Sequence, residues 1–284
     1  MAGRTRKIIS AVMAALMIMT AGGCGSSNKD IPSSADNSQY ISETKDNGNV
    51  TDGKEYDIDN GGLPYDEETV YNQLFDINNK VEIDVDISDD ELAKMQSDYN
   101  RYDNMGSKSP IYRKCDLKIS ITSDGVKNTY IIRNTGIRMK GNTSRTAFYD
   151  SNSGVYSLIH FKVDFTETFD DEQYYGGDSD YDLDIDKEKQ QNRTFATLDS
   201  MEIKWNQTSD STYVREYYTC EMYRDFGILA QRTNLASLNL GNVHEGIFKI
   251  YEPVDKKFIK RYVAKEDCGG DLYKCGWTRN GATF

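Results

Sequence analysis

Apolar and polar residues alternate along several short segments of this chain. Within Lys80–Ile87, the residues Val81, Ile83 and Val85 alternate with charged residues. A period of two is typical of a half-buried strand. The same pattern predicts further strands at residues 115–121, 130–139, 156–165, 201–205, 235–240 and 247–252.

Turn and helix signals separate these segments. Ser88 is followed three residues later by Glu91, a capping box that predicts a helix running to about Tyr99. The sequence Ser123-Asp124-Gly125 predicts a tight hairpin, because Asp-Gly suits the backbone of a two-residue turn. This order of elements predicts an α+β fold with a mostly antiparallel sheet.

The clearest helix is predicted over Thr212–Phe226, with Gly227 at its end. Its apolar residues share one face because they recur at a spacing of four. They are Val214, Tyr218, Met222 and Phe226, joined by Tyr217. We expect this face to pack against the sheet. Glu221 falls on the same face, and since an unpaired buried carboxylate is costly, it requires a cationic partner.

The N-terminal segment has the features of an export signal. Basic residues precede an apolar run over Ile8–Met19, which is shorter than the ~20 residues of a membrane-spanning helix. Small residues then lead to Cys24, as in a lipobox. Residues 1–23 are therefore predicted to be a lipoprotein signal peptide, with Cys24 carrying the lipid. The alternative is an ordinary secretory signal with an incidental cysteine.

The segment that follows differs in composition from the rest of the chain. Residues 24–62 are rich in Ser, Asn, Asp and Gly, too polar to offset their chain entropy by burial. They are predicted to be a disordered tether, and residues 63–284 a single domain. The expected location is the extracellular face of the cell membrane, where two acyl chains would hold the protein stably.

The chain is strongly acidic. Its formal charge is −12, and removing the signal with Arg4, Arg6 and Lys7 would take it to −15. Such a chain repels nucleic acid, so a DNA or RNA partner is excluded. Carboxylates alternate within an insertion at about residues 164–188, at Asp182, Asp184, Asp186 and Glu188. This run could bind calcium, but the turn glycine of an EF-hand-like loop is missing, so a solvated loop is favoured.

Cysteine and histidine are scarce. The chain has no CxxC pair and only two histidines, His160 and His244, which argues against a structural zinc site. In an exported protein Cys268 and Cys275 could form a disulfide across a short Gly-rich loop. Free thiols are the alternative.

The most distinctive segment is Gly136–Arg145, GIRMKGNTSR. The chain has no P-loop, no GxGxxG motif and no Ser-His-Asp set. In Gly136–Arg145, however, a predicted strand ends in a Gly-Asn turn flanked by Arg138, Lys140 and Arg145 and by two hydroxyls. Backbone amides and cations at such a turn can hold a phosphate. A solvated basic turn is the simpler alternative.

This segment also closely resembles the hallmark "iRlKGNSSR" segment of the CotH kinase family. Further matches follow in order. HFKVDF resembles the family's "lKF" strand, and the stretch from Tyr213 to Arg261 resembles its helix, hairpin and "G.y.l.E.vd..fl.r" block. GGDLYKC resembles its "G.LYK" element. The resemblance spans about Phe75 to Lys274, with the acidic segment as an insertion.

The resemblance implies an atypical protein-kinase-like fold, represented mostly by its N-terminal lobe. It implies ATP and magnesium as cofactors, and a reaction that transfers phosphate to Ser or Thr of spore-coat or cell-surface proteins. Lys162 looks like the strand lysine that neutralises nucleotide phosphates. Glu221 looks like its ion-pair partner, with Glu216 as the alternative. An ordinary surface lysine and a half-exposed helix acid are the simpler interpretation of Lys162 and Glu221.

Other positions of the resemblance would complete a nucleotide site. Arg138, Lys140 and Arg145 would lie near the phosphates, and Glu252 near an adenine-contacting hinge. The acids expected after the hinge are missing from their usual context, so we expect a C-terminally truncated domain without kinase activity. The alternative function is a non-catalytic cell-surface lipoprotein that binds coat or cell-wall partners.

Overall fold

The computed structural model describes residues 50–59, 64–141, 145–150, 155–206, 210–241, 243–273, 276–278 and 281–283. Several sequence predictions lie outside these residues. They concern the signal peptide at residues 1–23, the lipidated Cys24, the turn residues Asn142–Ser144, and Cys275. Those predictions stay predictions.

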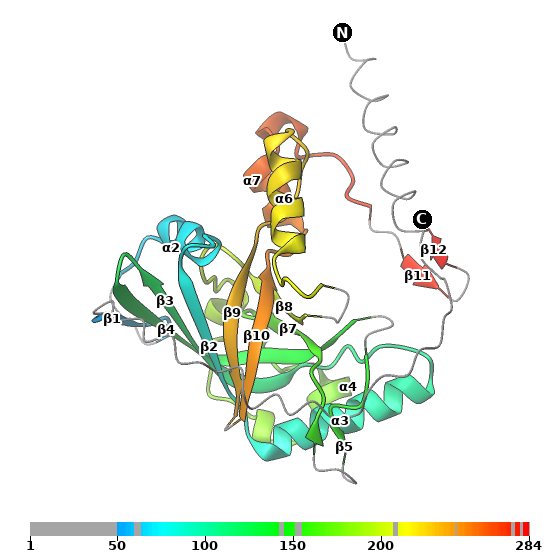
Figure 1. Cartoon of the computed structure of the whole chain (residues 1–284). Helices are drawn as coiled ribbons and strands as arrows, with labels where there is room; N and C mark the ends of the chain where they lie inside the picture. Colours follow the sequence, from blue (N-terminus) through cyan, green and yellow to red (C-terminus); the bar gives the residue numbers. More distant parts are fainter. Residues whose placement is uncertain are drawn as a thin grey trace, which may run out of the picture. The chain divides into compact units, whose positions relative to one another are not determined.

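The elements follow one another along the chain in the order shown in Figure 1. The strands are β1 (Thr51–Asp57), β2 (Lys80–Asp86), β3 (Arg113–Ser123), β4 (Val126–Lys140), β5 (Tyr149–Asp150), β6 (Val155–Tyr156), β7 (His160–Asp164), β8 (Ser200–Trp205), β9 (Thr233–Leu240), β10 (Val243–Tyr251), β11 (Gly276–Thr278) and β12 (Gly281–Thr283). The helices are α2 (Glu67–Leu74), α3 (Asp89–Asn104), α4 (Glu172–Tyr175), α5 (Lys187–Gln191), α6 (Arg215–Asp225) and α7 (Lys256–Tyr262), with short 3₁₀ turns at η2 (Ser179–Tyr181) and η3 (Lys265–Asp267).

The main sheet closes on itself. Its strand order is β1-β4-β3-β2-β9-β10-β8-β7, and β7 also pairs with the C-terminal part of β4. All of its strands except β1 therefore form a closed ring. Among the described ladders of this sheet only β1–β4 and β2–β9 are parallel. The prediction of an α+β fold with a mostly antiparallel sheet is confirmed.

Alternation along the strands separates an apolar interior from a polar exterior. Val81, Ile83 and Val85 of β2 are buried in the core, as their period of two predicts. Opposite Ile83 in register lie Ile119 of β3 and Leu238 of β9, both fully buried. The ring is thus filled by side chains and leaves its polar residues on the outside.

The tether is shorter than predicted. Residues Thr51–Asp57, which were expected to be disordered, form β1 and pair in parallel with β4. Beyond β1, the Asp59 carboxylate accepts hydrogen bonds from the backbone N–H of Arg133 at 2.7 Å and from Arg193 Nη1 at 2.6 Å. The prediction is wrong here because a polar composition shows only that the side chains of β1 are exposed. The strand is stabilised by backbone pairing with β4 and by contacts with residues distant in sequence.

Local signals in the sequence are confirmed at three places. Ser88 caps α3 by accepting a hydrogen bond from the backbone N–H of Glu91 at 3.2 Å. Asp124 and Gly125 join β3 to β4 with φ values of 50° and 77°, as a two-residue hairpin turn requires. Gly227, with φ 73°, follows the end of α6. Within the described residues, no helix is long and apolar enough to cross a membrane.

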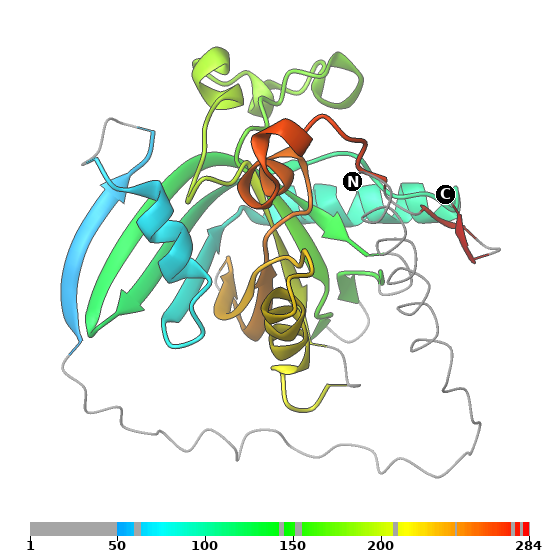
Figure 2. The same ribbon diagram turned by 90° about the horizontal axis from the view of Figure 1, so that it is seen from above.

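The acidic insertion between β7 and β8 is folded. Its carboxylates at residues 182, 184, 186 and 188 are exposed, as expected. Its aromatic side chains Phe169, Tyr175 and Tyr181, however, are buried in a small second core. Arg113 joins this core to α3 by hydrogen bonds to Tyr181 and Asp98. Figure 2 shows the insertion (yellow-green) and α6 (yellow) on opposite sides of the sheet.

Candidate functional site: a cationic cleft on the outer face of the sheet

The outer face of the sheet is polar where β4, β7, β8 and β10 lie side by side. A cleft of about 460 Å³ lies on this face. It is lined by Arg138, Lys140, Lys162, Ser200, Glu202, Gln231, Pro253, Val254, Asp255, Leu272 and Tyr273. Three of the four cations predicted to lie near phosphates are thus brought together, because their strands are neighbours and their side chains point outward.

Lys162 lies at the centre of this strand arrangement. It pairs in register with Arg138 on β4 and with Glu202 on β8. Its Nζ is 3.5 Å from Asp164 Oδ2 and lies 5.8 Å from the centre of the Tyr112 ring. Phe161 and Val163, its neighbours in sequence, are buried. Burial of these two residues directs the Lys162 side chain to the outer face.

Glu202 is the carboxylate that the sheet contributes to the cleft, and sequence reasoning missed it. It forms an ion pair with Lys140, and its other oxygen lies 3.5 Å from Lys204 Nζ. The signal was present in the alternation of Glu202 and Lys204 with the buried Met201 and Ile203. A period of two places Glu202 on the outer face, but it does not reveal which strand lies beside it.

Arg138 connects the cleft to the loop before β3. Its Nη1 donates to the Ser109 carbonyl at 3.1 Å, and its guanidinium lies 5.0 Å from the centre of the Tyr112 ring. Gly136, at the start of the same motif, is closely packed. A Cβ there would lie 2.9 Å from Glu167 Cβ and 3.0 Å from Tyr112 Cβ. The glycine therefore lets the insertion approach the sheet beside the cleft.

Arg145 does not line the cationic cleft with the other three cations, but it lines a small neighbouring pocket together with Arg138. Its Nη1 donates to the Ser107 carbonyl at 2.7 Å, and its Nη2 is 4.0 Å from Asp103 of α3. It is absent from the residues that line the cleft. Its predicted place near the phosphates stays a prediction; in the structure Arg145 packs against α3 and the loop that follows it.

The predicted ion pair between Lys162 and Glu221 is corrected. Glu221 pairs with Arg224 on its own helix. The apolar face of α6 is exposed rather than buried, with Tyr218, Met222 and Phe226 exposed by 62%, 47% and 76%. The spacing of four correctly identifies residues that share a face, but it does not say what covers that face.

Glu216 is the α6 residue that reaches the sheet. It accepts a hydrogen bond from Lys249 Nζ of β10 at 2.6 Å and another from the Tyr251 hydroxyl. Burial would raise the pKa of Glu216, but these two hydrogen bonds hold it below its ordinary value. The alternative partner named for Lys162 is thus engaged by Lys249. The carboxylate stays ionised and attaches α6 to the outer face (Figure 1).

The Glu252 side chain is buried and engaged by protein partners. It is 1% exposed and pairs with Arg261 of α7. Its other oxygen accepts from the Arg232 backbone N–H at 3.3 Å and from the Tyr262 hydroxyl at 3.2 Å. The prediction that Glu252 lies near an adenine-contacting hinge stays a prediction, while its side chain is engaged within the fold. Glu252 holds α7 against the end of β10, and the next residues, Pro253 to Asp255, line the cleft.

His160 lies beside the cleft on β7 and gives a test of this electrostatic arrangement. Burial and the positive charge of Lys204 lower its pKa to about 4; Glu216 acts against this shift, and Lys140 and Lys249 add to it. The unfolded chain has the ordinary value of about 6.5. Between pH 6.5 and 4 the unfolded state therefore binds a proton that the folded state does not, so stability falls as the pH falls.

We expect His160→Gln to flatten this pH dependence. The melting temperature of the wild type should fall more steeply between pH 6.5 and 4 than that of the variant. The difference between the two at pH 7.5, where the imidazole is neutral in both states, measures packing alone and is subtracted. Parallel melting curves across the acidic range would contradict the lowered pKa.

Cys268 belongs to the C-terminal part of the described chain. Its thiol lies 3.4 Å from the carbonyl oxygens of Val263 and Ala264, just after α7. Its predicted partner Cys275 lies outside the described residues. The disulfide therefore stays a prediction beside the alternative of free thiols.

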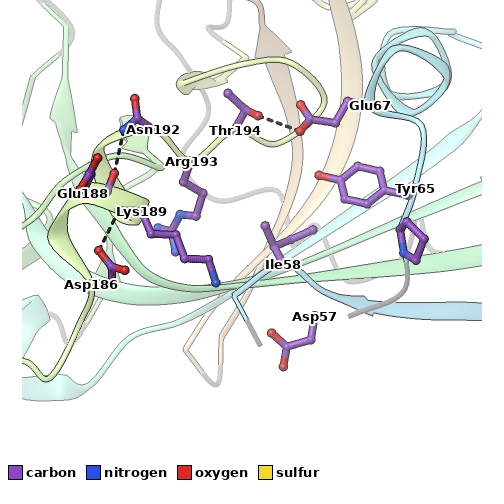
Figure 3. A pocket seen from close by; sticks show the side chains of 11 residues that line it. Asp57, Ile58, Tyr65, Glu67, Asp186, Glu188, Lys189, Asn192, Arg193 and Thr194 are labelled. Atoms are coloured by element: carbon purple, nitrogen blue, oxygen red, sulfur yellow. Dashed lines mark hydrogen bonds between the residues drawn. The ribbon is translucent and has the colours of Figure 1, made fainter. Parts of the chain in front are cut away.

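A larger cavity, of about 650 Å³, lies beside β1 and α5 (Figure 3). Its charged groups are used by the fold. Glu67 accepts hydrogen bonds from the Thr194 hydroxyl and the Thr197 backbone N–H at 2.7 and 2.6 Å. Arg193 donates to Asp59 and to three backbone carbonyls. These contacts join α2 and the segment after β1 to the insertion, so we do not assign the functional site here.

One group of carboxylates among the described residues has the spacing of a metal site: Asp90, Glu91 and Asp180. The ammonium of Lys94 lies between them, at 3.0, 3.3 and 2.9 Å from the three residues. The lysine supplies the positive charge that the carboxylates require. This cluster therefore serves to fasten the insertion to α3.

The domain is thus an α+β protein with a closed sheet and a cation-lined cleft on its outer face. The model of one protein family, described as CotH kinase protein, matches residues 137–283, just over half of the 284 residues. The chain belongs to the CotH kinase protein family, which associates it with spore-coat proteins. A comparison with curated proteins finds no match. The matched range includes Arg138, Lys140 and Lys162, and begins one residue after Gly136.

Proposed function

We propose that this chain is a kinase-like protein of the spore coat or cell surface whose cationic cleft binds the phosphates of ATP. The activity proposed for the fold is transfer of phosphate to Ser or Thr of coat or extracellular proteins. The observation that carries the proposal is the convergence of Arg138, Lys140 and Lys162 on one cleft. The proposed location, on the extracellular face of the membrane through a lipid on Cys24, follows from the N-terminal sequence.

The cleft has the chemistry of a phosphate site. Lys162 and Arg138 are opposite each other on β7 and β4, so two cations lie side by side on a rigid sheet. Phosphoryl groups are held mainly by such fixed positive charges. The carboxylate of Glu202 orients Lys140 from the next strand but one. In this arrangement a bound phosphate competes with Glu202 for Lys140.

The other side of the cleft is less polar. Pro253 and Val254, from the connection between β10 and α7, and Leu272 and Tyr273, from the segment after η3, line it. A cleft of about 460 Å³ falls in the size range of small-molecule sites. One cationic wall and one largely apolar wall suit a nucleotide, with phosphates at the sheet and the base at the connection.

The described residues of the cleft are better suited to bind phosphate groups than to bind a magnesium ion. The two carboxylates of Glu202 and Asp255 line the cleft, yet both are engaged. Glu202 pairs with Lys140 and Lys204, while Asp255 caps α7 by accepting from the backbone N–H of Lys257 and Phe258 at 2.8 and 3.0 Å. Magnesium prefers several oxygen ligands. We therefore propose magnesium only as the counter-ion that accompanies ATP, and derive no step through it.

Nucleotide binding is tested by melting the protein with and without magnesium-ATP. A ligand that binds only the folded state stabilises it and so raises the melting temperature. At a ligand concentration a hundredfold above Kd, the free energy of unfolding increases by about 2.7 kcal/mol. We expect this rise in the wild type and a Kd about 10–100-fold weaker in Lys162→Ala, the range for loss of one charge-assisted contact. Isothermal titration calorimetry gives the Kd directly.

The matched control is Lys118→Ala. Lys118 is an exposed lysine on β3, so this variant changes the net charge equally without touching the cleft. Equal Kd values for Lys162→Ala and Lys118→Ala would refute the assignment of the cleft. Transfer of labelled phosphate to Ser/Thr peptides is a separate measurement, which tests the proposed activity directly.

A second candidate function is supported by α6. Tyr218, Met222 and Phe226 present an exposed apolar stripe, and exposed apolar patches often mark contacts with other proteins. A non-catalytic surface protein would use such a stripe to bind coat or cell-wall components. Retention of partner binding in Lys162→Ala, together with absence of nucleotide binding in the wild type, would favour this alternative.

A further inference from the structure

A second pocket lies on the same outer face, between β7, β8, β10 and the start of α6. It has a volume of about 290 Å³. It is lined by His160, Lys204, Trp205, Asn206, Asp210, Arg215, Glu216 and Lys249, and it shares no lining residue with the cationic cleft. An inference about this pocket therefore does not rest on the proposed nucleotide site.

Two polar atoms at this pocket lack a hydrogen-bond partner. Asn206 is 4% exposed, and its Nδ2 donates to the Asp210 carbonyl, yet its Oδ1 accepts from no group. His160 Nδ1 is likewise buried without a partner. A buried carbonyl oxygen without a donor is destabilising, so such an atom at a cavity indicates a ligand that supplies the donor.

The charges around the pocket favour an anion. Within its lining, Lys204, Lys249 and Arg215 contribute three positive charges, against two negative charges from Asp210 and Glu216. Outside the lining, Glu202 lies 3.5 Å from Lys204, and within it Arg215 lies 4.0 Å from Asp210. Lys249 Nζ lies 2.6 Å from Glu216 and 3.5 Å from Asp210, so the two carboxylates share one buried ammonium. Burial is the largest cause of the lowered pKa of His160; the positive charges of Lys204, Lys140 and Lys249 add to the shift, and Glu216 opposes it.

The start of α6 adds to this preference. The residue at the N-cap position, Val214, has a side chain that cannot accept a hydrogen bond. The backbone N–H of Arg215, the first residue of α6, donates to the Asp210 carboxylate at 3.3 Å. Helix N-termini favour negative charge. The Arg215 side chain, at the first turn, is largely exposed and so can move toward a ligand.

We propose that this pocket binds a small oxyanion that carries a proton, as phosphate does at neutral pH. The charged oxygens would face Arg215 and Lys204, and the P–OH group would donate to Asn206 Oδ1. Inorganic phosphate presents this chemistry at neutral pH, and a phosphoserine side chain presents it in its monoanionic form, which is the minor form at pH 7 because its second pKa is about 6. Sulfate has the same shape and no proton at neutral pH, so an unpartnered acceptor at Asn206 discriminates against it.

The experiment is calorimetric titration of the whole chain with sodium phosphate and sodium sulfate at pH 7 and equal ionic strength. We expect saturable phosphate binding at least about tenfold tighter than sulfate binding, since a buried acceptor left unpaired discriminates strongly. Arg215→Ala should weaken the binding of both anions. Asn206→Ala should weaken phosphate binding alone and remove the discrimination. Because Arg215 is exposed, its variant remains informative if Asn206→Ala fails to fold.

Lys162→Ala separates this inference from the proposed function. That variant should lose ATP affinity and keep the phosphate affinity of the wild type. If phosphate binding is lost in Lys162→Ala and kept in Arg215→Ala, the anion binds in the cationic cleft instead, and the inference is overturned. Equal affinities for phosphate and sulfate would overturn it as well. A parallel titration with O-phosphoserine distinguishes the two sources: tighter binding than phosphate assigns the pocket to a modified side chain, and weaker binding to the free ion.

Discussion

Replacing Glu252 by alanine is expected to destabilise the domain by about 3–5 kcal/mol, because removing one partner of a buried ion pair leaves the other charge uncompensated. The charge left behind is that of Arg261, whose guanidinium also donates to Thr197 and lies 4.0 Å from the centre of the Tyr71 ring. The free energy of unfolding from urea titration, followed by far-ultraviolet circular dichroism, measures the change.

Two comparisons make this result specific. The exposed Glu266, replaced by alanine, should change stability by less than about 0.5 kcal/mol. The double variant Glu252→Leu with Arg261→Met should be more stable than Glu252→Ala, since it removes both charges together. If Glu252→Ala unfolds at the same urea concentration as the wild type, Glu252 does not hold α7 in the manner described.

The second large effect is expected for Arg193→Met. Arg193 is buried and donates to the carbonyls of Phe165 at 2.7 Å and Arg133 at 2.6 Å, as well as to Asp59 at 2.6 Å. Methionine keeps much of the volume but leaves these acceptors unpaired. We expect a loss of about 3–5 kcal/mol. Amide hydrogen exchange in Thr51–Asp57 should also speed up, because Arg193 joins the segment after β1 to the rest of the domain.

Lys187→Met is the matched control for Arg193→Met. Lys187 lies on α5, close to Arg193 in sequence, and pairs with Asp170 at 3.4 Å where both side chains are about half exposed. Exposed pairs of this kind contribute under about 1 kcal/mol. A comparable loss in the two variants would indicate a general effect of charge on the insertion rather than the loss of buried hydrogen bonds.

The parts of the fold that depend on neighbouring residues were predictable from the sequence. The cap at Ser88, the turn at Asp124-Gly125 and the end of α6 at Gly227 all follow from backbone chemistry within a few residues. The strand alternation around Ile83 likewise identified a core face correctly. The closure of the sheet was not predictable, because pairing between β4 and β7 or between β2 and β9 leaves no local signal.

The residues of the candidate site also include some that the sequence predicts and some that it does not. Arg138 and Lys162 could be placed on the outer face because buried residues adjoin them on their strands, and Lys140 because it follows the partly buried Met139; the resemblance supplied their order. The partner of Lys162 could not be assigned, since a helix face is defined by spacing while its contacts are set by tertiary packing. Glu216 rather than Glu221 therefore reaches the sheet, and Glu202, on a strand without a motif, was missed.

The closed ring of strands has a consequence for the order of folding. The hairpin of β3 and β4 joins residues that are close in sequence, whereas β2 pairs with β9, where Ile83 lies opposite Leu238. Contacts between such distant residues form late, because the intervening chain must lose its conformational freedom first. During synthesis, one edge of β2 therefore stays unpaired until β9 and β10 have been made, and the core is closed only then.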